Sequence, residues 1–256
     1  MDAPEFIRQI GHAWNLFDVD LNLGRAMICP VLLLADDEVR RVAMEPESSY
    51  AEIYRVGLSR SAYNFILQDY SYFQFSWESE HAWRMAYFPN PWITGVADAQ
   101  EAVEHWEAME AVGYLTHEEA SDLIGELPYM ASVPPIRFEY SRSQYREISH
   151  PAAHFHIGRD VDNRWPCAVL LGPLAFSMMI ARLYYPEHWR PRSSFEGASA
   201  ADCLDLRFAE VIQGSQVVHD FTRVERRTLH LGRNMVPVEQ APEHETQHLR
   251  RRRRRR

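Results

Sequence analysis

The sequence predicts an α+β fold, in which an antiparallel sheet packs against helices and carries an acidic helical insert. Residues 61–92 show the aromatic alternation and the turn residues of a three-stranded antiparallel meander. Further strand-like runs follow in the second half of the chain, with helical segments placed between them at irregular intervals. A regular alternation of strand and helix would instead indicate a parallel sheet, so the irregular order favours the α+β class.

In the first half, residues 2–18 carry apolar side chains at helical spacing, which predicts a helix. Residues 29–44, "CPVLLLADDEVRRVAM", are interpreted as an apolar strand, a turn at Asp36 and Asp37, and a second strand. The meander is expected to turn at Asp69 and again at residues 78–80, and to end at "PNP".

The acidic helical insert is predicted over about residues 97–128. "ADAQEAVEHWEAMEAVGYL" has Ala, Val, Trp and Met at helical spacing, and Gly113 suits the end of that helix. Thr116 followed by Glu119 is a capping-box pattern, which predicts that a second helix begins there.

The second half is expected to contain strands at residues 136–140 and 153–157 and a short strand within "NRWPCAVLLGP". A helix is predicted between Pro173 and Pro186, because proline suits the first turn of a helix and stops one elsewhere. "SQVVHDFTRVERRTLHLG" predicts a final strand pair. Together these elements predict a single α+β domain over residues 1–240.

Composition limits the class of protein. The chain has 256 residues, 46% of them hydrophobic, which is enough for a substantial core. Its three cysteines are scattered and form no CxxC pair, which argues against a disulfide framework and a cysteine-based zinc finger. No apolar run approaches the length of a membrane span. We therefore expect a cytoplasmic protein with no membrane partner.

The charges are distributed unevenly. All 27 basic residues are arginine, and seven of them form the run at residues 250–256. Without that run, 20 arginines face 36 acidic residues, a net charge of −16, which is not the basic surface that a non-specific nucleic-acid binder needs. Residues 241–256 are expected to be a disordered arginine-rich tail, either a tag or a native segment that binds RNA, DNA or an acidic partner.

The segment "SHPAAHFHIGR" places His150, His154 and His156 within seven positions. In a strand, His154 and His156 point to the same face and Phe155 points to the core. Two such imidazoles can bind one divalent metal, zinc or manganese, with His150 as a third ligand. They can also serve as the acid and the base in metal-free cleavage of a phosphodiester.

Known HxH sites do not account for this segment. A histidine triad requires HxHxH, but Gly158 stands at the third position. A cupin requires a glutamate shortly afterwards, where this chain has only Asp160 in approximate position. An amidohydrolase barrel needs eight strand–helix units, which the sequence does not show. The alternative is that these histidines are structural and hydrogen-bond to their neighbours on a polar sheet face.

Other residues are candidates for the same site. Arg137 and Glu139 share a face of the preceding strand, so they could lie beside the histidines. The alternative is that these two residues form a surface ion pair. Arg137 and Tyr140 are predicted to be catalytic. Arg159 and Arg182 are predicted to bind the substrate anion. Weaker candidates, for which turn or strand roles are favoured, are Asp69, Gln74, His219, Asp220, Glu225 and His230.

Six motifs in order resemble the bacterial domain-of-unknown-function family 2290. They are "YNFILQDYSYFQFS", "AWRMAYFPNPW", "IRFEY", "HPAAHFHIGR", "WP" and "PLAFSMMIARLYYPEHW", which together span roughly residues 50–231 apart from the insert. The resemblance implies a bacterial origin and a single domain, and no reaction. It emphasises the following positions: Asp69, Ser71, Arg137, Tyr140, His150, His154, His156 and Pro173.

Two functions are carried forward. In the first, the chain is a phosphodiesterase or nuclease-like hydrolase that acts on RNA or a nucleotide, in a bacterial toxin or phage-defence module. In the second, the chain is a non-catalytic binding or accessory protein, such as an antitoxin or a complex subunit that binds a protein partner. Clustering of the histidines with an arginine and a carboxylate favours the enzyme, and histidines scattered beside an exposed apolar patch favour the binding protein.

Overall fold

The computed structural model describes residues 1–34, 36–93, 97–116, 119–120, 122–123, 134–147, 149–159, 163–193 and 203–218. The chain divides into two units, Met1–Phe221 and Thr222–Arg256, and all of the described residues belong to the first. Several predictions lie outside the described residues: the strands expected after residue 218, the arginine-rich tail, and the candidates His219, Asp220, Glu225 and His230.

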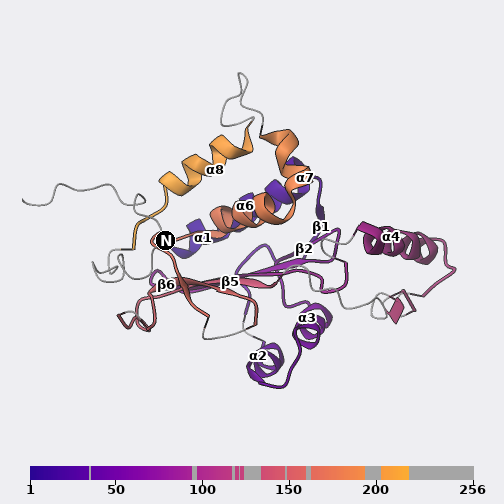
Figure 1. Ribbon diagram of the computed structural model, residues 1–256, viewed down its shortest axis with the longest axis horizontal. Helices are drawn as coiled ribbons and strands as arrows, with labels where there is room; N and C mark the ends of the chain where they lie inside the picture. The colour runs from indigo at the N-terminus through magenta and orange to yellow at the C-terminus, as the bar shows by residue number, and fades with distance from the viewer. Residues whose placement is uncertain are drawn as a thin grey trace, which may run out of the picture. The chain divides into compact units, whose positions relative to one another are not determined.

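The described residues form one seven-stranded antiparallel sheet, whose strands follow sequence order from one edge to the other (Figure 1). The strands are β1 (Gly24–Met27), β2 (Phe65–Leu67), β3 (Tyr72–Ser79), β4 (Ala82–Phe88), β5 (Ile136–Ser141), β6 (Ala153–Ile157) and β7 (Trp165–Pro166). Helices pack on both faces of this sheet, so the predicted α+β fold is confirmed.

The aromatic block folds into the predicted meander of β2, β3 and β4. Across β3 and β4, Phe73 pairs with Tyr87 and Trp77 pairs with Trp83. The turn between β2 and β3 is held by Asp69, whose Oδ1 accepts a 2.9 Å hydrogen bond from the Ser71 amide. Tyr70, inside this turn, has a left-handed φ of 63°. The hydrogen bond from the Ser71 amide to the neighbouring Asp69 side chain stabilises the turn.

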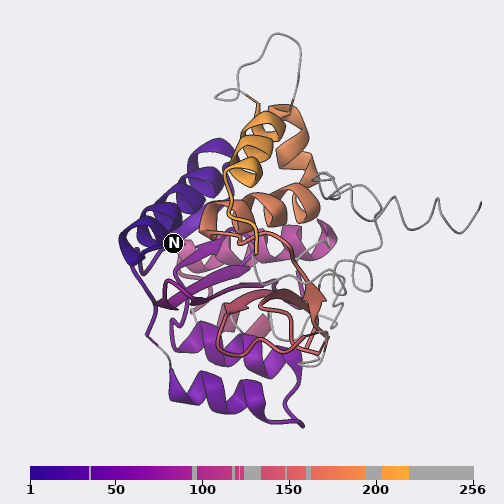
Figure 2. The same cartoon turned by 90° about the vertical axis from the view of Figure 1, so that its left-hand side faces the viewer.

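One face of the sheet packs against α1 (Ala3–Asn15) and α6 (Pro173–Tyr184), as Figures 1 and 2 show. Helix α1 begins after Asp2, whose side chain accepts the Glu5 amide. It continues into a π-helical turn, η1 (Leu16–Asp20), which buries Phe17 against the rings of the sheet. Beyond α6 lie α7 (Pro186–Trp189), the short turn η2 (Arg190–Arg192) and α8 (Leu204–Gln213).

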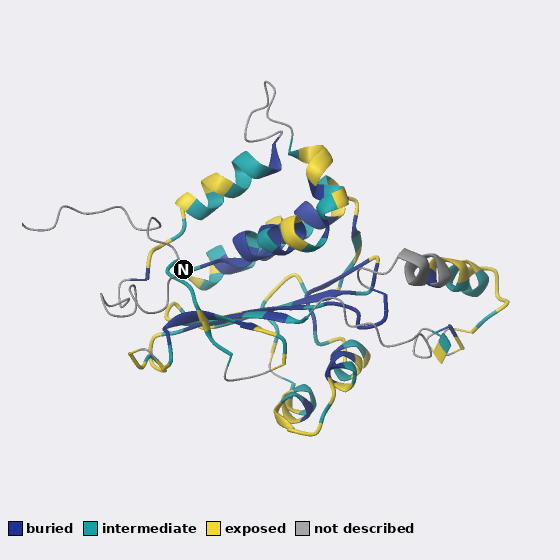
Figure 3. Cartoon of the chain, in the orientation of Figure 1, coloured by how far each residue is buried: buried dark blue, intermediate teal, exposed yellow. Residues whose placement is uncertain are grey.

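On the opposite face, α2 (Asp37–Met44) and α3 (Tyr50–Ser59) lie below the sheet in Figure 1. Helix α3 begins at a capping box in which Ser49 and Glu52 bond to each other's backbone amides. Helix α3 packs its tyrosines against β2 and β3 in a second core cluster: Tyr50, Tyr54, Tyr63, Ile66, Tyr72, Trp92, Ile93 and Val103. Both helices expose their outer sides, whereas the strands are largely buried (Figure 3).

The two strands predicted within residues 29–44 are wrong. Asp36 caps a helix instead, since its Oδ1 accepts the amides of Glu38 and Val39 at 3.0 Å each. Only Val42 is buried in that helix, so the segment lacks the alternate apolar side chains of a strand. The apolar run before it is irregular, and its carbonyls at residues 29 and 31 accept hydrogen bonds from the buried Asn64 side chain.

The first part of the insert is confirmed as α4 (Ala97–Ala111), followed by Gly113 with a φ of 80°. The predicted capping box is also present, because Thr116 N donates to Glu119 Oε2 at 2.8 Å and Glu119 N donates to Thr116 Oγ1 at 3.2 Å. The later part of the insert lies outside the described residues. Helix α6 and strands β5 and β6 stand where they were predicted, and β7 is shorter, with only two residues.

Candidate functional site

The candidate site lies on β5 and β6, on the face of the sheet opposite α1 and α6. In the antiparallel register, Arg137 pairs with His156 and Glu139 pairs with His154. Phe138 and Phe155 also pair, but they point to the other face, where Phe138 belongs to the main core and Phe155 packs against it. The alternation of each strand therefore brings one arginine, one carboxylate and two imidazoles together on a single face.

The histidines are almost fully enclosed. His154 exposes 1% of its surface and His156 exposes 3%, while the Glu139 side chain keeps 16%. The two Nε2 atoms lie 3.0 Å apart, and Glu139 Oε2 is 3.9 Å from His156 Nε2. One ligand atom from each of Glu139, His154 and His156 falls within 4.8 Å of the others, so the three form a compact set of possible metal ligands.

The hydrogen bonds around His154 define its tautomer. Its Nδ1 lies 2.8 Å from the Pro151 carbonyl, which can only accept, so Nδ1 carries the proton. The Nε2 of neutral His154 then presents a lone pair toward His156. Without a metal, His156 must donate from its Nε2, which leaves His156 Nδ1 as a buried atom without a hydrogen-bond partner within the described part of the chain.

The charge environment suits metal ligation. Burial lowers the pKa of His154, and burial together with the Arg137 guanidinium lowers the pKa of His156 to about 4. Burial acts to raise the pKa of Glu139, but Arg137 and Arg84 outweigh it, and that pKa falls below its usual value. Near neutral pH the set is therefore two neutral imidazoles and one carboxylate, the protonation states in which these groups bind a metal.

The spacing can be compared with a real coordination sphere. Two imidazole nitrogens bound to one tetrahedral zinc at about 2.0–2.1 Å are roughly 3.3 Å apart. The observed separation of 3.0 Å between the Nε2 atoms is within a few tenths of an ångström of this. Glu139 Oε2 lies 3.9 Å from His156 Nε2, so it would have to move closer by roughly half an ångström to share that ion. The residues therefore fit a metal ion with modest local adjustment.

His150 lies beside this set and not within it. Its ring centroid is 5.0 Å from that of His154, in an edge-to-face arrangement, and its Nδ1 lacks a hydrogen-bond partner among the described residues. Burial and the nearby Arg164 lower its pKa. The backbone of His150 pairs with Arg146 across a short turn, which holds the ring at the edge of the cluster.

Tyr140, Arg159 and Arg182 are not brought to the histidines. Tyr140 points to the core face, where its ring lies 4.5 Å from that of Trp83. Arg159 donates to the carbonyls of residues 45 and 46, at 2.6 and 2.7 Å. Arg182 is on α6, on the opposite face of the sheet, and pairs with Asp205 at 2.9 Å.

Arg137 remains at the site. Its Nε is 3.2 Å from Glu139 Oε1, a close ion pair that lacks the alignment of a hydrogen bond. Arg84 approaches the same carboxylate from β4 at 3.9 Å. Glu139 was expected only as a neighbour of the histidines, yet among the described residues it, and not His150, joins them in the group that could hold a metal ion. The sequence signal for it was its spacing of two residues from Arg137 on one strand.

Asp69 and Ser71 belong to a different buried cluster. Asp69 Oδ2 accepts hydrogen bonds from Ser71 Oγ and from the Tyr185 hydroxyl, each at 2.9 Å. The Tyr185 and Tyr87 hydroxyls are 2.8 Å apart. These groups tie the turn between β2 and β3 to the end of α6, so Asp69 has the structural role in a turn that was favoured for it.

Comparison with known proteins gives one match. The family described as "Uncharacterized conserved protein (DUF2290)" matches residues 29–232, which confirms the resemblance read from the motifs. No curated protein and no solved structure matches the chain. Among the described helices, none combines the length and the apolar character that crossing a bilayer requires.

Proposed function

This chain belongs to the DUF2290 family, and we propose that it is a metal-dependent hydrolase that cleaves a phosphodiester, in RNA or a nucleotide. The observation that carries the proposal is the convergence of Glu139, His154 and His156, whose ligand atoms lie within 4.8 Å of one another and whose imidazoles are almost fully buried. The same surroundings hold two arginines, which suit an anionic substrate.

Two histidines and one carboxylate are a recurrent ligand set for catalytic zinc and related divalent metals, and zinc or manganese fits here. Three protein ligands leave positions for water and substrate, and a bound metal lowers the pKa of that water so that it can attack at neutral pH. His154 would bind through Nε2, because its Nδ1 proton is held by the Pro151 carbonyl.

Metal-free acid–base catalysis is less well supported. An efficient acid–base pair needs a pKa near the working pH, and the pKa of His156 is about 4. A metal ion would instead use the two imidazoles in the neutral state that their lowered pKa values favour.

The arginines define the substrate end of the site. Arg137 exposes 35% of its side chain and Arg84 exposes 56%, so both reach solvent beside the buried ligands. Their guanidinium groups would hold the non-bridging oxygens of a phosphodiester while Glu139 stays on the metal. His150, at the edge of the cluster, would hydrogen-bond to the substrate beside the metal.

Hydrolysis of bis(4-nitrophenyl) phosphate and of a single-stranded RNA tests this proposal. The chelator-treated protein should be inactive, and zinc or manganese should restore its activity. Arg137→Gln should lower kcat/KM about tenfold or more, since a charge-assisted contact to the substrate is lost. Arg182→Gln, on the other face of the sheet, is the matched control and should change it less than about twofold. Activity that survives chelation would contradict the proposal.

A nuclease of this size would suit a bacterial toxin or phage-defence module, a role proposed by analogy with other small bacterial proteins. One observation favours the second function, that of a binding or accessory protein. Ile28, Val31 and Leu34 expose 50%, 49% and 93% of their surfaces within seven residues beside β1. Sedimentation of the chain alone would test whether this surface binds a second copy, because self-association should give a species larger than a monomer.

A further inference from the structure

Glu139 lies between two sets of side chains, the histidines on one side and two arginines on the other. In the sheet it is directly opposite Arg84 of β4 and directly opposite His154 of β6. Its Oε1 is 3.2 Å from Arg137 Nε and 3.9 Å from Arg84 Nε. Its Oε2 is 3.9 Å from His156 Nε2. One carboxylate is therefore shared between the candidate metal ligands and the candidate anion-binding groups.

The two arginines are held by this carboxylate when no metal is bound. Both guanidinium groups reach solvent, and each forms an ion pair with Glu139. Two guanidinium groups and one carboxylate carry a net charge of +1. The Oε1 atom of Glu139 is also an acceptor that competes with any incoming anion for the same donors. In the metal-free chain, Glu139 therefore weakens the binding of an anion to Arg84 and Arg137.

A divalent metal bound to Glu139 would change this balance. The cation brings two positive charges next to the carboxylate and becomes the largest local charge. It also attracts the negative charge of Glu139 through Oε2, so Oε1 competes less strongly for the guanidinium groups. Both effects raise the affinity of the two arginines for an anion. By thermodynamic linkage, a bound anion must strengthen metal binding by the same factor.

We propose that Glu139 couples the two halves of the site, so that a phosphodiester anion binds tightly to Arg84 and Arg137 once a metal has engaged the carboxylate. The metal-dependent half of this inference rests on the proposed function. The other half, that Glu139 itself restrains the arginines, rests on the ion pairs alone. The consequence is an order of binding, in which the metal comes first and the substrate second.

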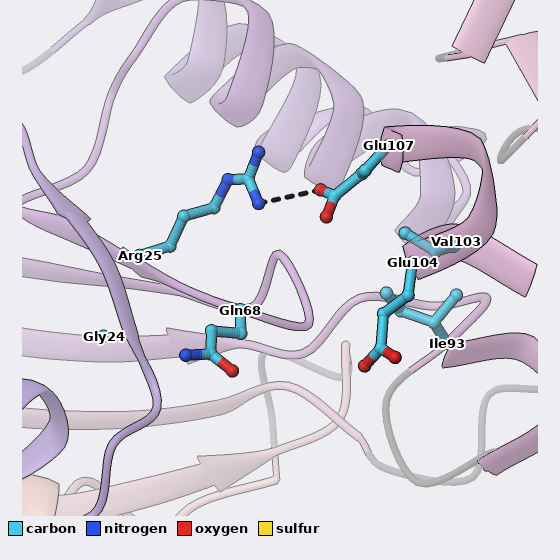
Figure 4. Close-up of a pocket in the computed structure, with 7 residues that line it drawn as sticks. All are labelled: Gly24, Arg25, Gln68, Ile93, Val103, Glu104 and Glu107. Atoms are coloured by element: carbon cyan, nitrogen blue, oxygen red, sulfur yellow. Dashed lines mark ion pairs between the residues drawn. The ribbon is translucent and has the colours of Figure 1, made fainter. Parts of the chain in front are cut away.

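An ion pair elsewhere in the chain provides the matched control. Arg25 of β1 and Glu107 of α4 are 2.7 Å apart at a cavity between these elements, as Figure 4 shows. Among the described residues that line this cavity there is no histidine and no second arginine. Glu107→Gln therefore removes a carboxylate from an arginine in the same way, but at a place without the second guanidinium group and the metal ligands.

Calorimetric titration of the full chain with dimethyl phosphate tests the inference, because this anion is a phosphodiester that lacks a good leaving group. The wild type is measured metal-free and again after loading with zinc or manganese. Glu139→Gln and Glu107→Gln are measured metal-free, after circular dichroism has shown that each is folded. Arg84→Gln, measured with metal, is a second variant that changes a side chain with 56% exposure and so disturbs the fold little.

Glu139→Gln should bind dimethyl phosphate about tenfold more tightly than the metal-free wild type, and Glu107→Gln should differ from it by less than about twofold. Metal loading of the wild type should also give a gain of about tenfold, most of which Arg84→Gln should remove. Equal affinities of Glu139→Gln and the metal-free wild type, or an equal gain in Glu107→Gln, would overturn the inference.

Two further outcomes separate this inference from the proposed function. If Glu139→Gln gains affinity but neither metal changes the wild type, Glu139 restrains the arginines as inferred and the proposed metal site is wrong. If Glu139→Gln does not fold, the metal-loaded proteins decide, and an Arg84→Gln variant that binds dimethyl phosphate as tightly as the wild type would overturn the inference.

Discussion

Two buried polar clusters lie in the same sheet, and they differ in how completely their hydrogen bonds are made. In the cluster of Asp69, Ser71, Tyr87 and Tyr185, every hydroxyl and carboxylate is engaged, and none appears among the buried polar atoms that lack a partner in the described part of the chain. In the cluster of Glu139, His154 and His156, the Nδ1 atom of His156 has no such partner.

The difference shows how a structural network can be told from a candidate functional one. A satisfied network rigidifies a fold, and it gains nothing from a ligand. In the second cluster a ligand atom from each of Glu139, His154 and His156 also falls within 4.8 Å of the others, an arrangement that could hold a metal ion. We therefore interpret the first cluster as a clamp on the turn between β2 and β3 and the second as a site.

The largest effect is expected when the clamp is broken. Asp69→Ala leaves the Ser71 amide, the Ser71 hydroxyl and the Tyr185 hydroxyl without their acceptor in the interior. The free energy of unfolding should fall by about 3–5 kcal/mol, as measured by urea denaturation. Asp69→Asn keeps one acceptor oxygen and should lose less. If the two substitutions are equally mild, the clamp is not a stabilising network.

A smaller effect is expected from pH in the metal-free protein. The pKa of His156 is about 4 in the folded chain, below the ordinary value of 6.5, so the unfolded chain binds the proton first as the pH falls. His156 therefore does not lower the free energy of unfolding above pH 6.5, where it is neutral in both states. As the pH falls from 6.5 to 4, the unfolded chain takes up the proton first and the free energy of unfolding decreases.

The measurement is urea denaturation at a series of pH values, for the wild type beside His156→Gln. Over that interval the wild type should lose about 2–3 kcal/mol more than the variant. A parallel pH dependence in the two proteins would mean that His156 titrates normally, and the contrast between the two clusters would weaken.

Tyr185→Phe should have a moderate effect. It removes one donor to Asp69 and the contact with the Tyr87 hydroxyl but keeps the buried ring. We expect a loss of about 1–2 kcal/mol in thermal or urea unfolding, with no change in metal content. A loss of metal in this variant would show that the clamp and the site are not independent.

Arg159→Ala should have the smallest effect. Its side chain is exposed, and within the part of the chain that the structure describes it bonds to two backbone carbonyls just after α2. Unfolding should change by less than about 0.5 kcal/mol. Phosphodiester hydrolysis should be unchanged, in contrast to Arg137→Gln. A large drop in hydrolysis would restore Arg159 as a substrate-binding residue.

Much of the fold was predictable because its signals are local. The aromatic alternation of residues 61–92 and the prolines around α6 specify their elements directly. Residues 37–44 were wrongly predicted to be a strand, because the apolar run before them suggested a strand pair and the capping role of Asp36 was not recognised. Strand β1 was missed because its four residues have little alternation and depend on β2 for pairing. Helix α3 could have been found from its capping box at Ser49 and Glu52.

The site was predictable only in part. The two-residue spacing of His154 and His156 predicted that they share one face of their strand. The same spacing predicted that Arg137 and Glu139 share one face of the preceding strand. The pairing register that joins the two faces is a long-range property, set by the turn and by the packing of Phe138 on Phe155. For the same reason the sequence did not show that Glu139, and not His150, lies with the two histidines in the group that could hold a metal ion.

The most direct test of the account is the metal content of the untagged protein, determined by elemental mass spectrometry. The wild type should carry about one zinc or manganese per chain, and the His154→Ala/His156→Ala double variant should carry none. Tyr185→Phe, which alters the clamp alone, should keep its metal. Absence of metal from the wild type after growth and reconstitution with both ions would contradict the account, and the histidines would then be structural.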